Sequence, residues 1–374
     1  MTQLPPPGIS VDTRDLRVAF LSDSLPERNG TGAYYQDLVT HLRHHLDAVC
    51  ILQPRARRGF DPLSMPMPGD ATQRLVIPDV RRIRRTLDEL DPHLIISVTP
   101  GPFGLLGPRT ARRMNIPFVT AYHTHFAGLA ALYWGPLRRR LANAPLQAAN
   151  RYLCRRSATV LVNNSELQSA VRALGARTCE VMGTPLDAGF LTAAPSPPRR
   201  IETVCFAGRL AAEKNIDAVL NAVHDWPDLG FVIAGDGPLR REVEAAAARC
   251  PNLRYVGWLE RRDLRQVIDG ASLLVLPSHA ETFGSVALEA MARARPVLVS
   301  AAAGIHDWPE LAPGLFRLGT EETLSTALRR LRGYPSDAVA AAGAAARQAA
   351  EAFHRGTLAQ WLEMLQRHVH RLQD

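Results

Sequence analysis

Residues 273–291 read LLVLPSHAETFGSVALEAM. The stretch opens with four apolar residues, passes through a polar loop and reaches Gly284, after which apolar residues recur with helical spacing. A short apolar run followed by a turn and a helix is the repeating unit of a parallel sheet covered by helices on both faces. The stretch therefore predicts one strand, loop and helix unit of an α/β fold.

The same unit recurs in both halves of the chain. In the first half we expect a helix at 32–44 and strands at 16–21, 48–52, 94–98, 118–121 and 159–162. In the second half we expect strands at 203–207, 229–234, 253–256, 273–276 and 296–299. The predicted architecture is two Rossmann-like, doubly wound domains that face each other across a cleft. Open parallel sheets bind ligands at the carboxyl ends of their strands, so functional residues are expected in the turns that follow strands.

The domain boundaries follow from a change in composition. Residues 192–200 are rich in proline and polar side chains, which suits a semi-rigid linker. We therefore expect a first domain at 1–191, the linker at 192–200 and a second domain at 201–352. The alanine-rich end of the chain has helical spacing, and residues 353–374 are expected to pack back on the first domain.

The length and composition are those of a globular protein. A chain of 374 residues exceeds the size of one ordinary core, and 46% of its residues are hydrophobic. It has neither a run of about 18 apolar residues nor an apolar stretch near its first residue, so a cytoplasmic location is expected. Its five cysteines are scattered, which argues against disulfides and against a zinc site.

The net charge of +8 comes from arginine clusters in the first half. An arginine excess favours anionic partners such as phosphates, lipid head groups or nucleic acid, and equally it can reflect only a biased composition. The basic residues are not interleaved with aromatic ones and form no recognition motif, so nucleic acid is not expected as a partner.

The first stretch also carries two carboxylates. Glu281 stands in the predicted loop and Glu289 stands eight residues later in the predicted helix. The first amides of that helix can hold a phosphate, so one carboxylate can reach a sugar and the other a ribose. Either glutamate taken alone would ordinarily be a solvated surface residue.

The two glutamates resemble the E-x₇-E signature of the retaining GT-B glycosyltransferases of family 4. Three further segments of the second half match in order. They are 206–214 with Gly208, Arg209 and Lys214, the turn at 235–239, and 256–259 with Trp258 and Leu259. We expect Gly235 and Gly237 to be turn glycines with positive φ. The resemblance implies the GT-B fold, a nucleotide-diphosphate sugar as partner and retention of anomeric configuration. It also implies that 1–191 is an acceptor-side domain and that 201–352 is a nucleotide-sugar-binding domain.

The resemblance also implies roles for these residues. Arg209 and Lys214 would bind the donor diphosphate and stabilise the departing charge without a metal or other cofactor. Glu281 would orient the sugar, Glu289 would hold the ribose, and Trp258 would lie at the base. The remaining donor-binding residues would be Gly30, Gly208, Leu259, Phe283, Gly284, Ser285 and Val286.

In the first half, Asn29, Gly30 and Thr31 follow the opening strand in a glycine-containing loop. Residues 121–126 resemble the Y-H-T-D-F motif of lipid-directed and related members of the family. By that likeness His123 lies beside the transferred sugar as a catalytic residue. Tyr122 and His125 would stand on the acceptor side with Asn29 and Thr31, and His125 replaces the usual Asp.

Two features leave the acceptor open. Only Gly183 and Asp187 are retained where family members commonly carry N-G-V-D or R-G-V-D. Residues 126–140 place apolar and aromatic residues beside three arginines, as a segment at the surface of an anionic membrane would, or as a helix that packs on its own domain would. A lipid acceptor at the inner membrane surface is one hypothesis.

A nucleotide-sugar-binding module or an epimerase without transferase activity is the alternative to a transferase.

Overall fold

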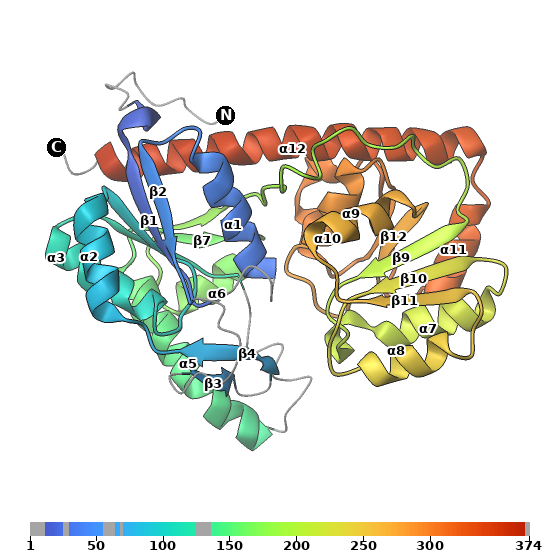
Figure 1. Ribbon diagram of the computed structural model, residues 1–374, viewed down its shortest axis with the longest axis horizontal. Coiled ribbons are helices and arrows are strands. Elements are labelled where there is room, and N and C mark those ends of the chain that lie inside the picture. Colours follow the sequence, from blue (N-terminus) through green and yellow to red (C-terminus); the bar gives the residue numbers. More distant parts are fainter. Residues whose placement is uncertain (1–11, 25–29, 55–63, 68–69, 124–135, 371–374) are drawn as a thin grey trace.

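The computed structural model describes the chain at residues 12–24, 30–54, 64–67, 70–123 and 136–370. It consists of two α/β halves joined by an irregular segment and by one long helix that runs along both of them (Figure 1). None of the helices in these ranges is long and apolar enough to cross a membrane.

The first half is built on a parallel sheet with strand order β2-β1-β5-β6-β7-β8. Its strands are β1 Arg17–Leu21, β2 Ala48–Leu52, β5 Leu94–Ser97, β6 Phe118–Ala121, β7 Val160–Val162 and β8 Cys179–Val181, beside a hairpin of β3 Ser64–Met67 and β4 Asp70–Val76. Its helices are α1 Gly30–Leu42, α2 Val80–Leu90, α3 Gly107–Met114, α5 Pro136–Arg156 and α6 Leu167–Ala173, with 3₁₀ turns η1 Thr13–Asp15 and η2 Gly104–Leu106.

The second half is built on a parallel sheet with strand order β11-β10-β9-β12-β13-β14. Its strands are β9 Thr203–Ala207, β10 Gly230–Ala234, β11 Leu253–Gly257, β12 Leu273–Leu276, β13 Val297–Ser300 and β14 Leu315–Leu318. Its helices are α7 Ile216–Asp225, α8 Arg240–Ala247, α9 Arg261–Asp269, α10 Ser285–Ala292, α11 Leu324–Arg332 and α12 Ser336–His370, with 3₁₀ turns η3 Ala212–Lys214, η4 Gly304–Asp307 and η5 Pro309–Leu311.

The predicted strands were right to within one residue at each end. All four residues of β12 are buried, as expected of a central parallel strand that is covered on both faces. The predicted helix at 32–44 begins two residues earlier, at Gly30. The sequence did not predict the β3–β4 hairpin, β8 or β14, because these segments are short or carry polar and charged residues.

The helix α12 belongs to both cores. Phe353 packs in the core of the second half, whereas Trp361, Met364 and Leu365 pack in the core of the first half. The predicted segment at 353–374 is therefore the end of one continuous helix that begins at Ser336 rather than a separate helix. Leu186 and Phe190 precede the predicted linker but pack in the core of the second half, so the change of core comes before residue 192.

Candidate active site

The turn after β9 is held in place by close packing against the turn after β10. The Gly208 amide donates to the Ala234 carbonyl at 3.0 Å, and a Cβ on Gly235 would collide with the Gly208 carbonyl oxygen. Gly235 also has φ +143°, as predicted. Gly237 does not have positive φ, which corrects the prediction. Its constraint is steric, because a Cβ there would collide with the Leu210 carbonyl oxygen.

Two of the predicted residues meet at the carboxyl edge of the second sheet. Lys214 ends η3, and its Nζ lies 2.5 Å from Oε2 of Glu281 in the loop after β12. Their side chains are only 20% and 14% exposed. The loop is fixed by the His279 amide, which donates to the Glu213 carbonyl at 2.8 Å, and by the Asn215 side chain, which donates to the Pro277 carbonyl at 3.1 Å.

Lys214 is the only lysine in the chain, against 43 arginines. The neighbouring cation is Arg209, whose Nη1 lies 3.5 Å from the buried carboxylate of Glu213. A compact ammonium and a planar guanidinium thus stand on the loop between β9 and α7. Each of these cations is paired with a carboxylate, Arg209 with Glu213 and Lys214 with Glu281.

The helix α10 begins as expected and presents its second glutamate to an arginine. Gly284 precedes it with φ +102°, a conformation that favours glycine. Glu289 is buried, and its Oε1 lies 3.3 Å from Nη2 of Arg261. Burial raises the pKa of Glu289 to about 7, while the charge of Arg261 opposes that rise. Glu289 is therefore not the solvated residue that a lone glutamate would suggest.

Other predicted donor residues differ in what their side chains can reach. The ring of Phe283 is buried in the core and stacks on Phe353, with 5.9 Å between the ring centroids. Leu259 is half-buried against the same core. Trp258 follows Gly257, which has φ +71°, and its side chain is 53% exposed. Ser285 and Val286 are half-buried in the first turn of α10.

In the first half, His123 follows β6 and is buried. Its Nε2 lies 2.7 Å from the Tyr35 hydroxyl, and burial lowers the pKa of the imidazole to about 4. The ring is therefore neutral in ordinary buffers. The Tyr122 side chain packs in a core cluster, so its predicted acceptor contact is not available to the phenol ring. Gly30 and Thr31 open α1, whereas Asn29 and His125 lie outside the described residues.

The sequence did not single out Asp23, which follows β1. Its carboxylate accepts hydrogen bonds from the Thr99 hydroxyl at 2.6 Å, the Phe103 amide at 2.8 Å and the Gly104 amide at 3.3 Å. Burial raises the pKa of Asp23, and these hydrogen bonds oppose the rise. Asp23 thus fixes the loop after β5 at the carboxyl edge of the first sheet.

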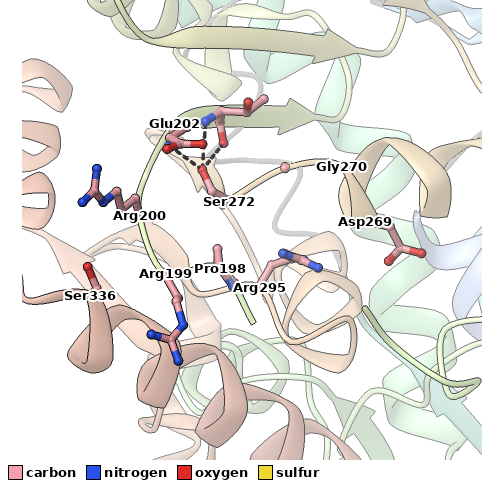
Figure 2. Close-up of a pocket in the computed structure, with 11 residues that line it drawn as sticks. Pro198, Arg199, Arg200, Glu202, Asp269, Gly270, Ser272, Arg295 and Ser336 are labelled. Atoms are coloured by element: carbon pink, nitrogen blue, oxygen red, sulfur yellow. Dashed lines mark hydrogen bonds between the residues drawn. The ribbon is translucent and has the colours of Figure 1, made fainter. Parts of the chain in front are cut away.

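A cavity of about 490 Å³ lies at the other edge of the second sheet. It is lined by residues ahead of β9, β12 and β13, so it stands at the amino ends of these strands. Figure 2 shows Arg199, Arg200 and Arg295 in it, with Ser272 bonded to the backbone at Glu202. Its lining also holds Glu202 and Asp269, and none of the predicted site residues that the structure describes belongs to it.

Within the described ranges, no group of three or more His, Cys, Asp or Glu side chains is arranged so that it could hold a metal ion. Arg209 and Lys214, the two residues predicted to bind the diphosphate, lie on the turn and 3₁₀ helix after β9.

Both halves match families of known proteins. Residues 28–190 match Glycosyltransferase Family 4, and residues 201–332 match Glycosyl transferases group 1. The sulfoquinovosyl transferase SQD2 of Arabidopsis thaliana is 26% identical over 325 residues, which are 79% of this chain and 62% of that protein. The chain thus spans less than two thirds of SQD2. A GDP-mannose-dependent alpha-mannosyltransferase of Mycobacterium tuberculosis is 27% identical over 316 residues, 78% of this chain and 81% of that one.

Solved structures share the whole arrangement. A sucrose-phosphate synthase from Thermosynechococcus elongatus has a TM-score of 0.73 at 16% identity and covers 95% of this chain and 100% of its own. HepE of Anabaena in complex with UDP-glucose has a TM-score of 0.66 at 17% identity and covers 93% of this chain and 98% of its own. The fold and the two family matches define a glycosyltransferase of the GT-B type. Within that class, the match to Glycosyltransferase Family 4 lies in the first half and the match to Glycosyl transferases group 1 lies in the second half.

Proposed function

We propose that the chain transfers a hexose from a UDP- or GDP-sugar to an acceptor with retention at the anomeric carbon. The observation that carries this proposal is the contact between Lys214 and Glu281 at the carboxyl edge of the second sheet, beside Arg209. A cation for the diphosphate and a carboxylate for the sugar hydroxyls stand together there. The chain contains 43 arginines and one lysine, and that lysine is Lys214.

The two cations would stabilise the diphosphate as it leaves, so the reaction needs no metal in this proposal. Fixed charges that are already in place cost no reorganisation when charge develops on the leaving group. Arg209 can hold two phosphate oxygens at once, whereas Lys214 supplies a point charge. Glu281 would orient the sugar and Glu289 the ribose.

The neutral ring of His123 favours a front-face reaction. An imidazole whose pKa is held near 4 is a weak base, so it is poorly suited to deprotonate the acceptor near neutral pH. The leaving phosphate would take the proton of the acceptor instead, while the sugar passes through an oxocarbenium-like state. His123 would then orient or stabilise the sugar through hydrogen bonds, with its ring held by Tyr35.

The acceptor we propose is a lipid or a lipid-linked glycan at the inner face of a membrane. The support is the apolar and aromatic stretch next to Arg138, Arg139 and Arg140, most of which lies outside the described residues. Flotation with anionic and with neutral vesicles tests this step. Binding to the anionic vesicles alone is expected, and the absence of any binding would remove the membrane from the proposal.

A binding module or an epimerase is the second candidate, and it is not favoured. Both halves match glycosyltransferase families, and Arg209, Lys214, Glu281 and Glu289 of the proposed transfer site are all present. Release of the nucleotide from the donor decides between the two candidates. A transferase releases it, whereas an epimerase changes the sugar while the sugar stays attached to the nucleotide.

The uniqueness of Lys214 offers a direct test. The protein is labelled with an amine-reactive ester, with and without UDP-glucose, UDP-galactose, UDP-N-acetylglucosamine or GDP-mannose, and labelling is read by mass spectrometry. We expect one donor to protect Lys214 while the amine of the first residue, which serves as internal control, stays equally reactive. Donor hydrolysis and thermal shift are measured beside it. If no donor protects Lys214 or shifts the melting temperature, the donor site is not where we place it.

A further inference from the structure

Three carboxylates converge on one guanidinium where the two halves meet. Arg261 begins α9 in the second half, and its Nη1 lies 2.7 Å from Oδ2 of Asp37 on α1 of the first half. The same nitrogen lies 3.5 Å from Oδ2 of Asp187, and Nη2 lies 3.3 Å from Oε1 of Glu289 on α10. Figure 1 shows α1 on the side of the first half that faces α9 and α10. One side chain thus joins the first half to a predicted donor residue.

The balance of charge makes each carboxylate depend on this arginine. Asp37 and Glu289 are only 7% and 8% exposed, and one cation stands against three carboxylates. Burial raises the pKa of Asp37 and of Glu289 to about 7, and Arg261 opposes both shifts. Loss of Arg261 would leave buried carboxylates without a counter-charge, which is costly.

We propose that Arg261 is a positioning residue that couples contact between the two halves to donor binding. Asp37 of the first half holds the guanidinium of Arg261, and that guanidinium orients Glu289 of the second half toward the donor. The proposal rests on the proposed function, because it takes Glu289 as the residue that holds the donor ribose. It adds two residues that the sequence did not single out.

The geometry explains why an arginine stands at this place. The guanidinium is a rigid planar fork, so Nη1 can hold Asp37 while Nη2 holds one oxygen of Glu289. That arrangement leaves the other oxygen of Glu289 for the ribose hydroxyls. A lysine would keep the charge but could not fix both carboxylates with one planar group.

The coupling works in both directions. Asp37 can reach Arg261 only when α1 and α9 are adjacent, so the contact favours the state in which the halves are together. A donor that engages Glu289 favours the same orientation of Arg261 and thereby the same contact. By linkage, the Asp37 contact strengthens donor binding by the same factor by which bound donor strengthens the contact.

The test is calorimetric titration of the full chain with UDP and with GDP. Asp37→Asn is the informative variant, because Asp37 lies in the half that does not hold the nucleotide. We expect it to weaken binding of the preferred nucleotide about 5-fold to 10-fold, and Arg261→Lys and Arg261→Gln to weaken it by at least as much. Small-angle scattering should show a larger radius of gyration for Asp37→Asn than for the unaltered protein.

Arg265→Gln is the matched control. Arg265 lies one turn further along α9 and donates to the Gly189 carbonyl at 2.8 Å, without a carboxylate partner among the described residues. It should leave nucleotide affinity within 2-fold, and melting temperatures show that each variant is folded. If the unaltered protein binds nucleotide and Asp37→Asn binds it equally well, the coupling is wrong while the donor site stands. If the unaltered protein binds neither nucleotide, the proposed function fails and the coupling fails with it.

Discussion

The hydroxyl of Tyr35 lies 2.7 Å from Nε2 of His123, and both side chains are buried. Burial holds the pKa of Tyr35 well above its ordinary value and lowers that of His123 to about 4, so both groups are neutral near pH 7. The hydrogen bond therefore fixes the orientation of an uncharged ring on the loop that follows β6.

A first prediction concerns the titration of this ring. His123 should titrate near pH 4 in an NMR experiment on labelled imidazole groups, and no break between pH 5 and 8 in the rate profile should come from it. Its folded pKa is below the unfolded value of 6.5. Its contribution to stability is thus complete above pH 6.5 and is lost as the pH falls toward 4. An NMR titration midpoint near 6.5 would contradict the buried, neutral ring.

The effect of the Tyr35 hydrogen bond can be measured while the ring of His123 stays in place. Tyr35→Phe removes one hydroxyl, which should lower the free energy of unfolding by about 1 kcal/mol. If the contact orients His123 for the proposed reaction, the same change should lower kcat more than it changes KM, since the ring loses its orientation and not its place. An unchanged kcat would mean that packing alone orients the ring.

A second prediction concerns the anchoring of α12. Trp361 is fully buried among Phe20, Tyr34 and Tyr35, and its Nε1 donates to the Tyr34 hydroxyl at 3.1 Å. Trp361→Ala should lower the free energy of unfolding by about 3–5 kcal/mol, measured in urea.

The control for this change lies on the same helix. Arg367 is half exposed and pairs with Glu180 at 2.6 Å, and Arg367→Ala should change stability by less than about 1 kcal/mol. Equal effects of the two substitutions would show that the end of α12 does not pack in the core of the first half.

Much of the fold could be predicted because the central strands are buried on both faces. All four residues of β12 and the last four residues of β9 are apolar and buried, as a parallel sheet covered on both faces requires, and the bounds of both strands match the prediction. The strand β14 contains Arg317 and lies at the edge of its sheet, so its pattern is not that of a buried strand. Edge strands are less constrained by burial and leave weaker signals in a sequence.

Contacts between site residues could be predicted only where both residues belong to motifs at the carboxyl edge of the same sheet. Lys214 and Glu281 each follow a strand of one parallel sheet, so their meeting follows from topology. Asp37 and Arg261 are 224 residues apart in different halves, and their contact depends on how the halves pack. The sequence also did not predict that the ring of Phe283, an expected donor-binding residue, would lie in the core against Phe353 of α12.

A third prediction concerns Trp258, whose side chain is 53% exposed directly after β11. If it stacks on the nucleotide base, Trp258→Ala should weaken nucleotide binding by about 1–3 kcal/mol, as the loss of a base–aromatic contact does. The melting temperature should change little because the ring is exposed. Tyr334→Ala, at an exposed aromatic residue between α11 and α12, should leave affinity unchanged. Equal losses in both variants would point to a general effect on the fold.

A fourth prediction separates stability from activity at Lys214 and Glu281. Glu281→Gln alone leaves the ammonium of Lys214 largely buried without its counter-charge, so this variant should lose stability. Adding Lys214→Met removes that charge as well and should restore much of the lost stability, because the two residues are in contact and their effects are not additive.

Activity should respond differently to the same set of variants. In the proposed function each single change removes a group that acts on the leaving diphosphate or on the sugar, so each should lower kcat/KM by about 10²-fold to 10³-fold. The double variant should recover in urea unfolding yet stay inactive in donor turnover. Lys214→Arg keeps the charge but not the compact shape, so it should fold well and still lose activity. Full activity in Lys214→Arg would show that any cation suffices there, and the single lysine of the chain would then need another explanation.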